Sequence, residues 1–209
     1  MYKRQLQEDF VNPDNPMCVP EAYRQIPRVK TLIEGCRDLG MPVLFTEHTI
    51  NADCAGRYYE FWDEIAAGAT REGNEGTGVY HEIAPEAGQR VIAKHSYDAF
   101  ANTNLDYVLR SQGIQTVIIC GTLTNYCCEG TARGAFSHQY DVVFGSDVCA
   151  TNNPDQHLAT LRTMRYGFAR VMDHETILRL LHDGDGIHLQ ARTEREKRDK
   201  RVDPVKAHE

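Results

Sequence analysis

Two adjacent cysteines are the first residues in this chain whose type and position suggest chemistry. Cys127 and Cys128 follow the apolar run QTVIIC and begin a helical pattern, in the stretch CGTLTNYCCEG. The amino end of a helix presents unpaired backbone N–H groups and a positive dipole, which favour a thiolate and stabilise an oxyanion. Cys128 lies about 100° around the helix from Cys127, so only one thiol can face the strand ends. Taken alone, the stretch fits two packing cysteines equally well.

The elements that would position this stretch alternate along the chain. Apolar residues spaced by three and four predict an amphipathic helix between Pro20 and Gly40. Helical segments separate short apolar runs that predict buried strands, namely PVLFT, QRVIAK, QTVIIC, DVVFG and ARVMD. This alternation predicts an α/β fold with a parallel or mostly parallel sheet between helices, and a site at the carboxyl ends of the strands.

Two helices carry recognisable start signals, and one long segment carries none. Asn153 can cap a helix in which Pro154 takes the first position, and Asp173 can cap the last helix. The glycine-rich segment 51–88 shows little periodicity and is expected to be an irregular excursion, with a short helix near YEFWDEIAAG. Long excursions of this kind usually carry function.

The composition limits the range of partners. The 209 residues are 41% hydrophobic and 25% charged, with a net charge of −7, as in an ordinary globular protein. The negative charge argues against nucleic acid or a membrane surface and favours a small molecule as partner. The chain shows neither an 18-residue apolar run nor a charged-then-apolar leader, and its seven cysteines are an odd number. We therefore expect reduced thiols and a cytoplasmic protein.

One domain is expected, over residues 1–185. The remaining residues 186–209 are nearly all polar and should form a disordered tail or an arm that contacts another subunit. A nucleic-acid-binding arm is the weaker alternative, because acidic residues are interleaved with the basic ones.

The residues around Cys127 resemble a known family. The stretch CGTLTNYCCEGTARGAFSHQYDVVFGSDVCA is similar to the nucleophile segment of the isochorismatase-like cysteine hydrolases, G-x-x-T-N-x-C-x-E-x-T-x-R-x-A followed by a strand and S-D-A. This match selects Cys127 as the nucleophile. VIAKHSYDAFANTNLDYVLRSQG resembles the family's lysine segment and places the catalytic lysine at Lys94, while LQEDFVNP and GTGVYHEIAPEAG resemble two further stretches. The resemblance extends from Leu6 to about Leu181.

The resemblance implies a Rossmann-like three-layer α/β/α sandwich, assembled as a homodimer or homotetramer. It also implies hydrolysis through a covalent thioester, with an aspartate, Lys94 and Cys127 as the catalytic residues. The thiolate attacks a carbonyl carbon, the carboxylate moves the proton, and the ammonium holds the charge of the thiolate. A cis peptide is expected between Thr122 and Leu123, so that the N–H groups of Leu123 and Cys127 form an oxyanion hole.

The amino-terminal residues depart from the family pattern. The family's D-x-Q-x-D-F begins with the acid/base aspartate, and Gln5 stands in that position here. An amide cannot act as a base. Asp9 is no substitute, since four residues of extended strand span roughly 13 Å. The preceding MYKR is polar and too short to cross a sheet, so the first strand is expected to be missing or truncated.

Two interpretations of Gln5 follow. MYKRQ resembles a translated adapter sequence, which favours a natural protein that carries aspartate at this position and is an ordinary enzyme. The alternative is a natural variant with impaired chemistry, acting as an oligomeric binding or scaffold protein. A redox protein that uses vicinal Cys127 and Cys128 is a further class, but adjacent cysteines close a strained ring.

Neither a metal nor another cofactor is expected. Nicotinamidases of the family bind a metal through Asp-x-His, whereas Asp53 here lacks a histidine two residues on. His48 is expected to be structural or at the rim of the site, with substrate contact the minor alternative. His95 and His157 are expected to be structural.

The expected substrate is a small amide or a carbamoyl or ureido compound. Cys127 favours cleavage of a C–N bond, as in the family members that act on carbamoylsarcosine, ureidoacrylate and biuret. Phe10, Trp62 and Tyr126 are candidate substrate contacts, because aromatic groups orient a small planar amide. Core packing is an equally good interpretation of Phe10 and Trp62.

Overall fold

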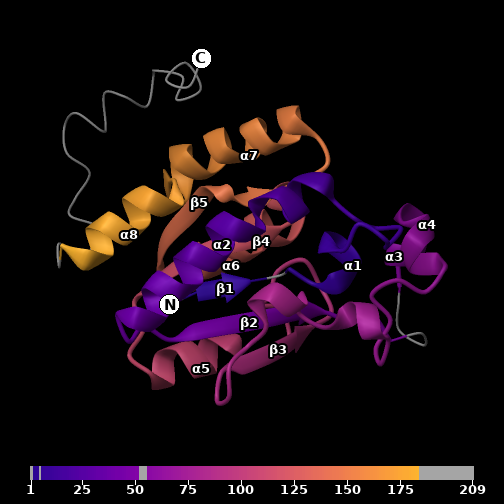
Figure 1. Ribbon diagram of the computed structural model, residues 1–209, viewed down its shortest axis with the longest axis horizontal. Helices are drawn as coiled ribbons and strands as arrows, with labels where there is room; N and C mark the ends of the chain where they lie inside the picture. The colour runs from indigo at the N-terminus through magenta and orange to yellow at the C-terminus, as the bar shows by residue number, and fades with distance from the viewer. Residues whose placement is uncertain (1, 5, 52–55, 184–209) are drawn as a thin grey trace.

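The computed structural model describes residues 2–4, 6–51 and 56–183. These residues form one sheet of six strands, with helices against both of its faces (Figure 1). Gln5 and residues 186–209, on which two of the predictions rest, lie outside the described residues. In the described part of the chain no helix is both long and apolar enough to cross a membrane.

The sheet is parallel, as predicted. Every pair of neighbouring strands is parallel, in the order β3-β2-β1-β4-β5-β6. The strands are β1 Tyr2–Arg4, β2 Val43–His48, β3 Arg90–Lys94, β4 Thr116–Thr122, β5 Asp141–Ala150 and β6 Arg170–Met172. The strand order reverses between β1 and β4, and sheets of this kind place their sites beyond the carboxyl ends of the strands at such a point.

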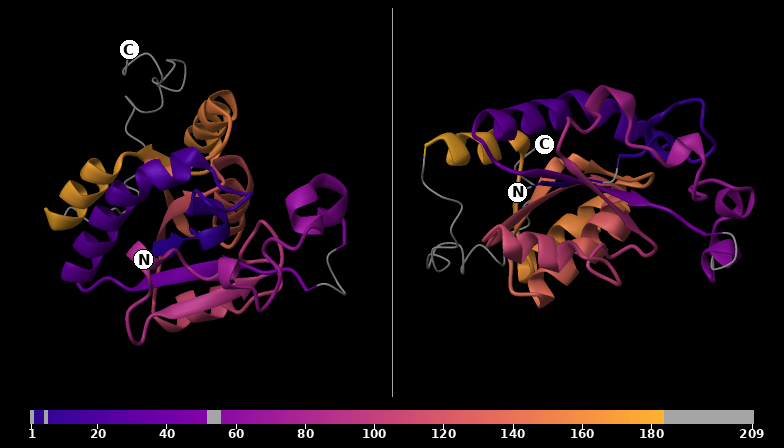
Figure 2. Two further views of the ribbon diagram at one scale, coloured as in Figure 1. Left: turned by 45° about the vertical axis from the view of Figure 1, so that its right-hand side comes forward. Right: turned by 90° about the horizontal axis from the view of Figure 1, so that it is seen from below.

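Helices form the two outer layers and confirm the three-layer sandwich. One face carries α2 Pro20–Asp38 and α8 His174–His182, and the other carries α5 Leu105–Ser111, α6 Glu129–Ser137 and α7 Pro154–Gly167 (Figure 2). The core fills both interfaces with the sheet, because strands covered on both sides bury successive residues. In β2 and β5, for example, Phe45 and Phe144 are fully buried.

The first strand is truncated rather than missing. Residues Tyr2–Arg4 form β1, which pairs with β2 on one side and with β4 on the other. Sheet hydrogen bonds are made by the backbone, so polar residue types do not prevent this pairing. At 3 residues β1 is nevertheless much shorter than β4, which has 7.

The predicted helix signals are confirmed. The Asn153 side chain accepts hydrogen bonds from the backbone N–H groups of Asp155 and Gln156, and Pro154 follows it at the first helical position. Asp173 likewise accepts from Thr176 N at the start of α8. β5 extends well beyond the predicted run DVVFG, to Ala150.

The loops after β1 and β2 contain only short helices. The first loop forms α1 Glu8–Val11, so the assumption that the chain stays extended through Asp9 is wrong. The excursion after β2 contains α3 Tyr58–Phe61, α4 Asp63–Ala66 and two 3-10 turns at Glu75–Thr77 and His81–Ile83. α3 and α4 lie together at one end of the molecule (Figure 1).

Candidate active site

Lys94 and His48 meet at the carboxyl end of the sheet. Each is the last residue of its strand, β3 or β2, and the two residues are partners in the parallel register. Their side chains are almost completely buried, with exposed fractions of 1% for Lys94 and 2% for His48. A buried lysine needs acceptors for its protons, so its surroundings decide whether it is an ammonium.

The ammonium group of Lys94 contacts the predicted nucleophile. Its Nζ lies 3.4 Å from Cys127 Sγ and 3.3 Å from His48 Nδ1. It also donates to the backbone carbonyls of Ser96 at 2.6 Å and Tyr97 at 3.3 Å. The predicted pair of Lys94 and Cys127 is therefore brought together from two segments 33 residues apart.

Burial and charge act on this group in opposite directions. Burial lowers the pKa of the Lys94 ammonium, while the negative charge of the neighbouring Cys127 thiolate raises it. For His48, burial and the charge of Lys94 both lower the pKa, to about 3. The imidazole is thus neutral across the physiological range and can only accept a hydrogen bond from an ammonium.

Cys127 stands in a distorted turn between β4 and α6. Residues Thr124–Cys128 form a five-residue π-helical turn, a feature that often marks functional sites. The peptide bond between Thr122 and Leu123 is cis, as predicted. The Leu123 carbonyl accepts hydrogen bonds from the N–H groups of Tyr126 at 3.2 Å and Cys128 at 3.1 Å, which holds the turn in place.

The two cysteines face different surroundings. Cys127 is 7% exposed and contacts Lys94, whereas Cys128 is 3% exposed and belongs to the hydrophobic core. Cys128 also hydrogen-bonds to Cys149, whose thiol pKa burial raises. The helical offset therefore separates a thiol at the strand ends from a packing thiol.

Aromatic rings surround the ends of β2, β3 and β4. The ring of Tyr97 lies 5.2 Å from those of Tyr58 and Tyr126, and 6.3 Å from His48, measured between centroids. Trp62 donates a 3.0 Å hydrogen bond to the Tyr97 hydroxyl and stacks edge-on against Tyr126. Burial, followed by the charges of Tyr97 and Cys127, raises the pKa of Tyr58 to about 12, so this phenol stays protonated.

Of the predicted aromatic contacts, Phe10 lies in a different hydrophobic cluster from Tyr126. It is 5% exposed and packs in a small second core with Met17, Ile50 and Ile65, against which Trp62 is also packed. The packing alternative therefore fits Phe10. Trp62 and Tyr126 are only partly buried and share the aromatic group around Tyr97.

Asp9 is engaged away from Lys94. Its carboxylate accepts a 2.7 Å hydrogen bond from Thr70 N and lies against Gly76, where a side chain would collide with it. Burial raises the pKa of this carboxyl. Within the described residues, the groups hydrogen-bonded to Lys94 Nζ are an imidazole, two carbonyls and a thiol, and no carboxylate.

The other histidines singled out in the sequence hold loops in place. His157 bridges Thr124 Oγ1 at 2.9 Å and the Ser146 carbonyl at 3.1 Å, and His95 contacts the Thr49 carbonyl at 2.7 Å. No cluster of three or more His, Cys, Asp or Glu side chains suited to a metal ion occurs in the ranges that the structure describes.

Sequence reasoning missed three residues of this site. Tyr97 comes three residues after Lys94, and its position in the lysine segment could have drawn notice. Gln7, fully buried, hydrogen-bonds to the backbone of His48 and belongs to the D-x-Q-x-D-F stretch. Tyr58 lies in the irregular excursion, where no local pattern distinguishes it.

Comparison with known proteins assigns the family. The isochorismatase domain matches residues 5–176, which is most of the chain. This chain belongs to the isochorismatase family. The assignment agrees with the resemblance found around Cys127 and Lys94.

Relatives of this isochorismatase-family chain include amide-cleaving enzymes. Nicotinamidase 3 of Arabidopsis thaliana is 34% identical over 158 residues, covering 73% of this chain and 77% of the relative. Ureidoacrylate amidohydrolase RutB of Yersinia enterocolitica is 30% identical over 167 residues, covering 72% and 73%. The crystal structure of a cysteine hydrolase from Pseudomonas syringae superimposes with a TM-score of 0.81 at 25% identity, covering 87% of this chain and 91% of that one.

Proposed function

We propose that this protein is a cysteine-dependent hydrolase that cleaves the C–N bond of a small amide or a carbamoyl or ureido compound. The observation that carries the proposal is the 3.4 Å contact between Lys94 Nζ and Cys127 Sγ, made by two nearly buried side chains. A buried ammonium beside a thiol favours the thiolate, which is the nucleophilic form of cysteine.

The reaction proceeds through a covalent thioester. The Cys127 thiolate attacks the carbonyl carbon and forms the C–S bond, and the developing oxyanion is held by the N–H groups of Leu123 and Cys127. Collapse of this intermediate breaks the C–N bond, and the nitrogen takes the proton that an acid/base group at position 5 removed from the thiol and leaves as ammonia or an amine. Water then gives a proton to the same group and attacks the thioester, releasing the acid and restoring the thiolate, while Lys94 balances the negative charge throughout.

Residue 5 is the position that would move the proton in this reaction. Gln5 can neither take the proton from a thiol nor return it to the leaving nitrogen. We therefore expect slow turnover in the chain as it stands and rescue by Gln5→Asp combined with apolar residues in place of 2–4. Absence of rescue would remove residue 5 from the mechanism.

The aromatic group favours a small planar substrate. Tyr58, Tyr97, Trp62 and Tyr126 supply ring faces and hydroxyl groups beside Cys127, and such groups orient a flat amide without a strong charge requirement. The relatives named for nicotinamide and ureidoacrylate agree with this class. The protein is proposed to act in the cytoplasm as a homodimer or homotetramer.

An ammonia-release screen tests the proposal. The panel should contain aliphatic amides, aromatic amides and ureido acids, assayed with the chain as it stands and with the Gln5→Asp variant. The Cys127→Ser variant should abolish release, while the matched Cys128→Ser variant should retain it. Release that survives Cys127→Ser would contradict the proposal.

A catalytically silent binding protein is the second candidate, and Gln5 is the observation that favours it. Iodoacetamide labelling followed by mass spectrometry separates the two. Selective modification of Cys127 near neutral pH supports the hydrolase, whereas slow, uniform labelling of all cysteines supports the silent protein.

A further inference from the structure

His48 occupies a position that calls for an explanation beyond packing. Its ring nitrogen Nδ1 lies 3.3 Å from Lys94 Nζ, and the side chain is 2% exposed. We propose that His48 is a positioning residue, whose neutral imidazole accepts a hydrogen bond from Lys94 and directs the ammonium at Cys127. This inference rests on the proposed function, because it assigns His48 to the same lysine and thiol.

The proton positions on His48 follow from its neighbours. An ammonium can only donate, so Nδ1 must carry the lone pair that faces Lys94. The ring proton is then on Nε2, where it can donate to the backbone of Ser96, with which His48 hydrogen-bonds. Ser96 also accepts from Lys94 Nζ at 2.6 Å through its carbonyl. The lysine and the histidine are thus tied to the same turn after β3.

Gln7 fixes the backbone of His48 from the other side. Its Oε1 accepts from His48 N at 2.6 Å, and its Nε2 donates to the His48 carbonyl at 3.0 Å and to the Thr77 carbonyl at 2.8 Å. Gln7 is fully buried, so these bonds are shielded from water. The Gln7 amide therefore fixes the backbone of His48, the last residue of β2, and with it the position from which the imidazole extends.

The aromatic rings restrict the imidazole further. Tyr58 meets it edge-on at 5.2 Å, and Tyr97 stacks near it at 6.3 Å between centroids. These contacts pack around the ring, while its Nδ1 edge meets Lys94. Substrate contact, the minor alternative drawn from the sequence, fits the partly buried Tyr126 better than His48.

The other titratable groups near Lys94 and His48 do not replace this acceptor. Cys127, Cys128 and Asp98 all raise the pKa of Lys94 by their charge, and only Cys127 is bonded to its Nζ. His95 acts on His48 by charge alone. Tyr58 and Tyr97 have raised pKa values and stay neutral. His48 is therefore the side-chain acceptor that can orient the ammonium before the thiolate is consumed.

Two substitutions separate orientation from bulk. His48→Asn places an amide oxygen at about the position of Nδ1, whereas the amide of His48→Gln reaches the position of Nε2 and leaves no side-chain acceptor at the position of Nδ1. The readout is the rate at which iodoacetamide modifies Cys127 in the full chain between pH 5 and pH 10, followed by mass spectrometry. This readout does not depend on turnover or on the identity of the substrate.

The expected result is a difference between the two variants. His48→Asn should keep the wild-type dependence of the labelling rate on pH. In His48→Gln, iodoacetamide should modify Cys127 about tenfold more slowly at pH 7, and the midpoint of the rate–pH curve should move to higher pH, as for a lost hydrogen bond to a charged group. Equal profiles for both variants, changed or unchanged, would overturn the inference. If wild-type Cys127 reacts no faster than Cys128, both the inference and the proposed function are wrong.

Folding is checked by circular dichroism at each pH. If His48→Gln does not fold, His48→Ser removes the acceptor with less bulk and is compared with His48→Asn in the same way. A wild-type chain that labels selectively while both variants behave alike would leave the proposed function standing and reject only the role of His48.

Discussion

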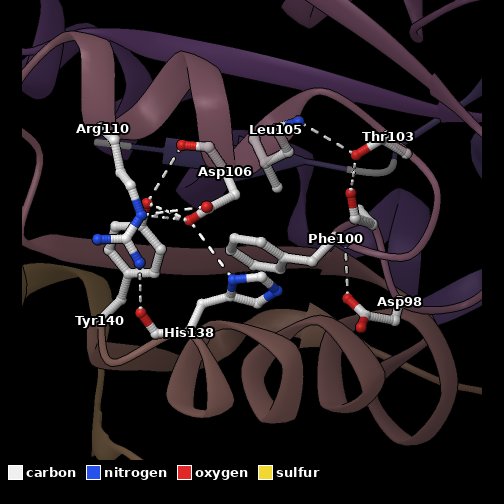
Figure 3. A network of polar contacts seen from close by, with 9 residues as sticks. Asp98, Phe100, Thr103, Leu105, Asp106, Arg110, His138 and Tyr140 are labelled. Atoms are coloured by element: carbon white, nitrogen blue, oxygen red, sulfur yellow. Dashed lines mark hydrogen bonds and ion pairs between the residues drawn. The ribbon is translucent and has the colours of Figure 1, made fainter.

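Two clusters of charged and aromatic side chains in this molecule differ in how their charges are balanced. Asp106, Arg110, His138 and Tyr140 form a network between α5 and the connection from α6 to β5 (Figure 3). Lys94, Cys127 and His48 form the other cluster, at the carboxyl ends of the strands. Both clusters contain hydrogen-bonded charges. In the Asp106 network a carboxylate faces a guanidinium, whereas among the described residues Lys94 Nζ has no carboxylate partner.

The Asp106 network is fully compensated. Arg110 Nε donates to both carboxylate oxygens of Asp106 at 3.0 Å, and the Tyr140 hydroxyl donates to Asp106 at 2.8 Å. Burial raises the pKa of the Asp106 carboxyl, but these hydrogen bonds outweigh burial and the net pKa lies below its usual range. The Asp106 carboxylate and the Arg110 guanidinium balance each other, so the network has no unpaired charge that could bind or activate a substrate.

The Lys94 cluster is compensated only by the nucleophile. In the described part of the chain, the other partners of Lys94 Nζ are neutral, namely two carbonyls and an imidazole. A buried cation in such a place is costly unless the thiol beside it becomes a thiolate. An incompletely balanced charge, rather than the number of polar contacts, distinguishes the proposed active site from the Asp106 network.

The largest expected effect is on turnover when the thiol is removed. Cys127→Ala should lower ammonia release by at least about a thousandfold, because no other group can form the covalent intermediate. The matched Cys128→Ala variant should change the rate by less than about tenfold, since Cys128 only packs in the core. Steady-state assays of both variants check this. Equal losses of ammonia release in the two variants would contradict the assignment of Cys127 as the nucleophile and Cys128 as a packing residue.

Replacement of the lysine should separate activity from stability. Lys94→Met should lower turnover about a hundredfold or more, while the free energy of unfolding stays the same or rises, because a desolvated cation is removed. Arg110→Met, in the compensated network, should leave turnover unchanged. Urea unfolding with parallel assays tests the pair. If Lys94→Met were active but less stable than the wild type, Lys94 would stabilise the fold, as Arg110 does, and would not take part in catalysis.

The pH dependence of stability should be concentrated at the Lys94 cluster. The pKa of His48 is lowered to about 3, below its usual 6.5, so the unfolded chain binds the proton first. Stability is therefore full above pH 6.5 and falls as the pH drops, by about 3 kcal/mol at pH 4 from this histidine. His48→Asn should flatten the slope, although His157, whose pKa burial also lowers, keeps part of it. Urea unfolding of the two proteins from pH 4 to 7 would show identical slopes if His48 were protonated in the folded state.

The smallest effect is expected from the compensated network. Tyr140→Phe removes the 2.8 Å hydrogen bond to Asp106 but leaves Arg110 in place, so it should cost about 1–2 kcal/mol of unfolding free energy. Turnover and its pH profile should not change. Thermal unfolding and an activity assay check this together, and a changed pH profile would mean that the two clusters are coupled.

Local patterns in the sequence were sufficient to predict most of the fold. The spacing of apolar residues predicted α2 and the buried strands, and the capping side chains of Asn153 and Asp173 lie where expected. For β1 the sequence left open whether the strand was missing or truncated, because a central strand of three polar residues pairs through its backbone and carries no apolar signal. The turn at Glu8–Val11 was missed for a similar reason, since it is only one turn long.

The site was predicted only in part, because its contacts join distant segments. The family pattern around Cys127 and Lys94 supplied the pair that the structure brings within 3.4 Å. Gln7 and Tyr58 could not be found in the same way, since their partners are 41 residues away in one case and across an irregular excursion in the other. A sequence pattern can identify residues at the ends of strands and helices. The hydrogen-bond acceptors and aromatic rings around them come from loops, whose path the local sequence does not determine.

Rapid acid quenching followed by peptide mapping tests the central claim most directly. The chain as it stands and its Gln5→Asp variant are mixed with the amide and ureido compounds that release ammonia, quenched within the first turnover and digested. An acyl group is expected on the peptide that contains Cys127, formed at the rate of ammonia release and absent in Cys127→Ser. Ammonia release at an undiminished rate in Cys127→Ser, with no acyl group on any cysteine, would contradict it.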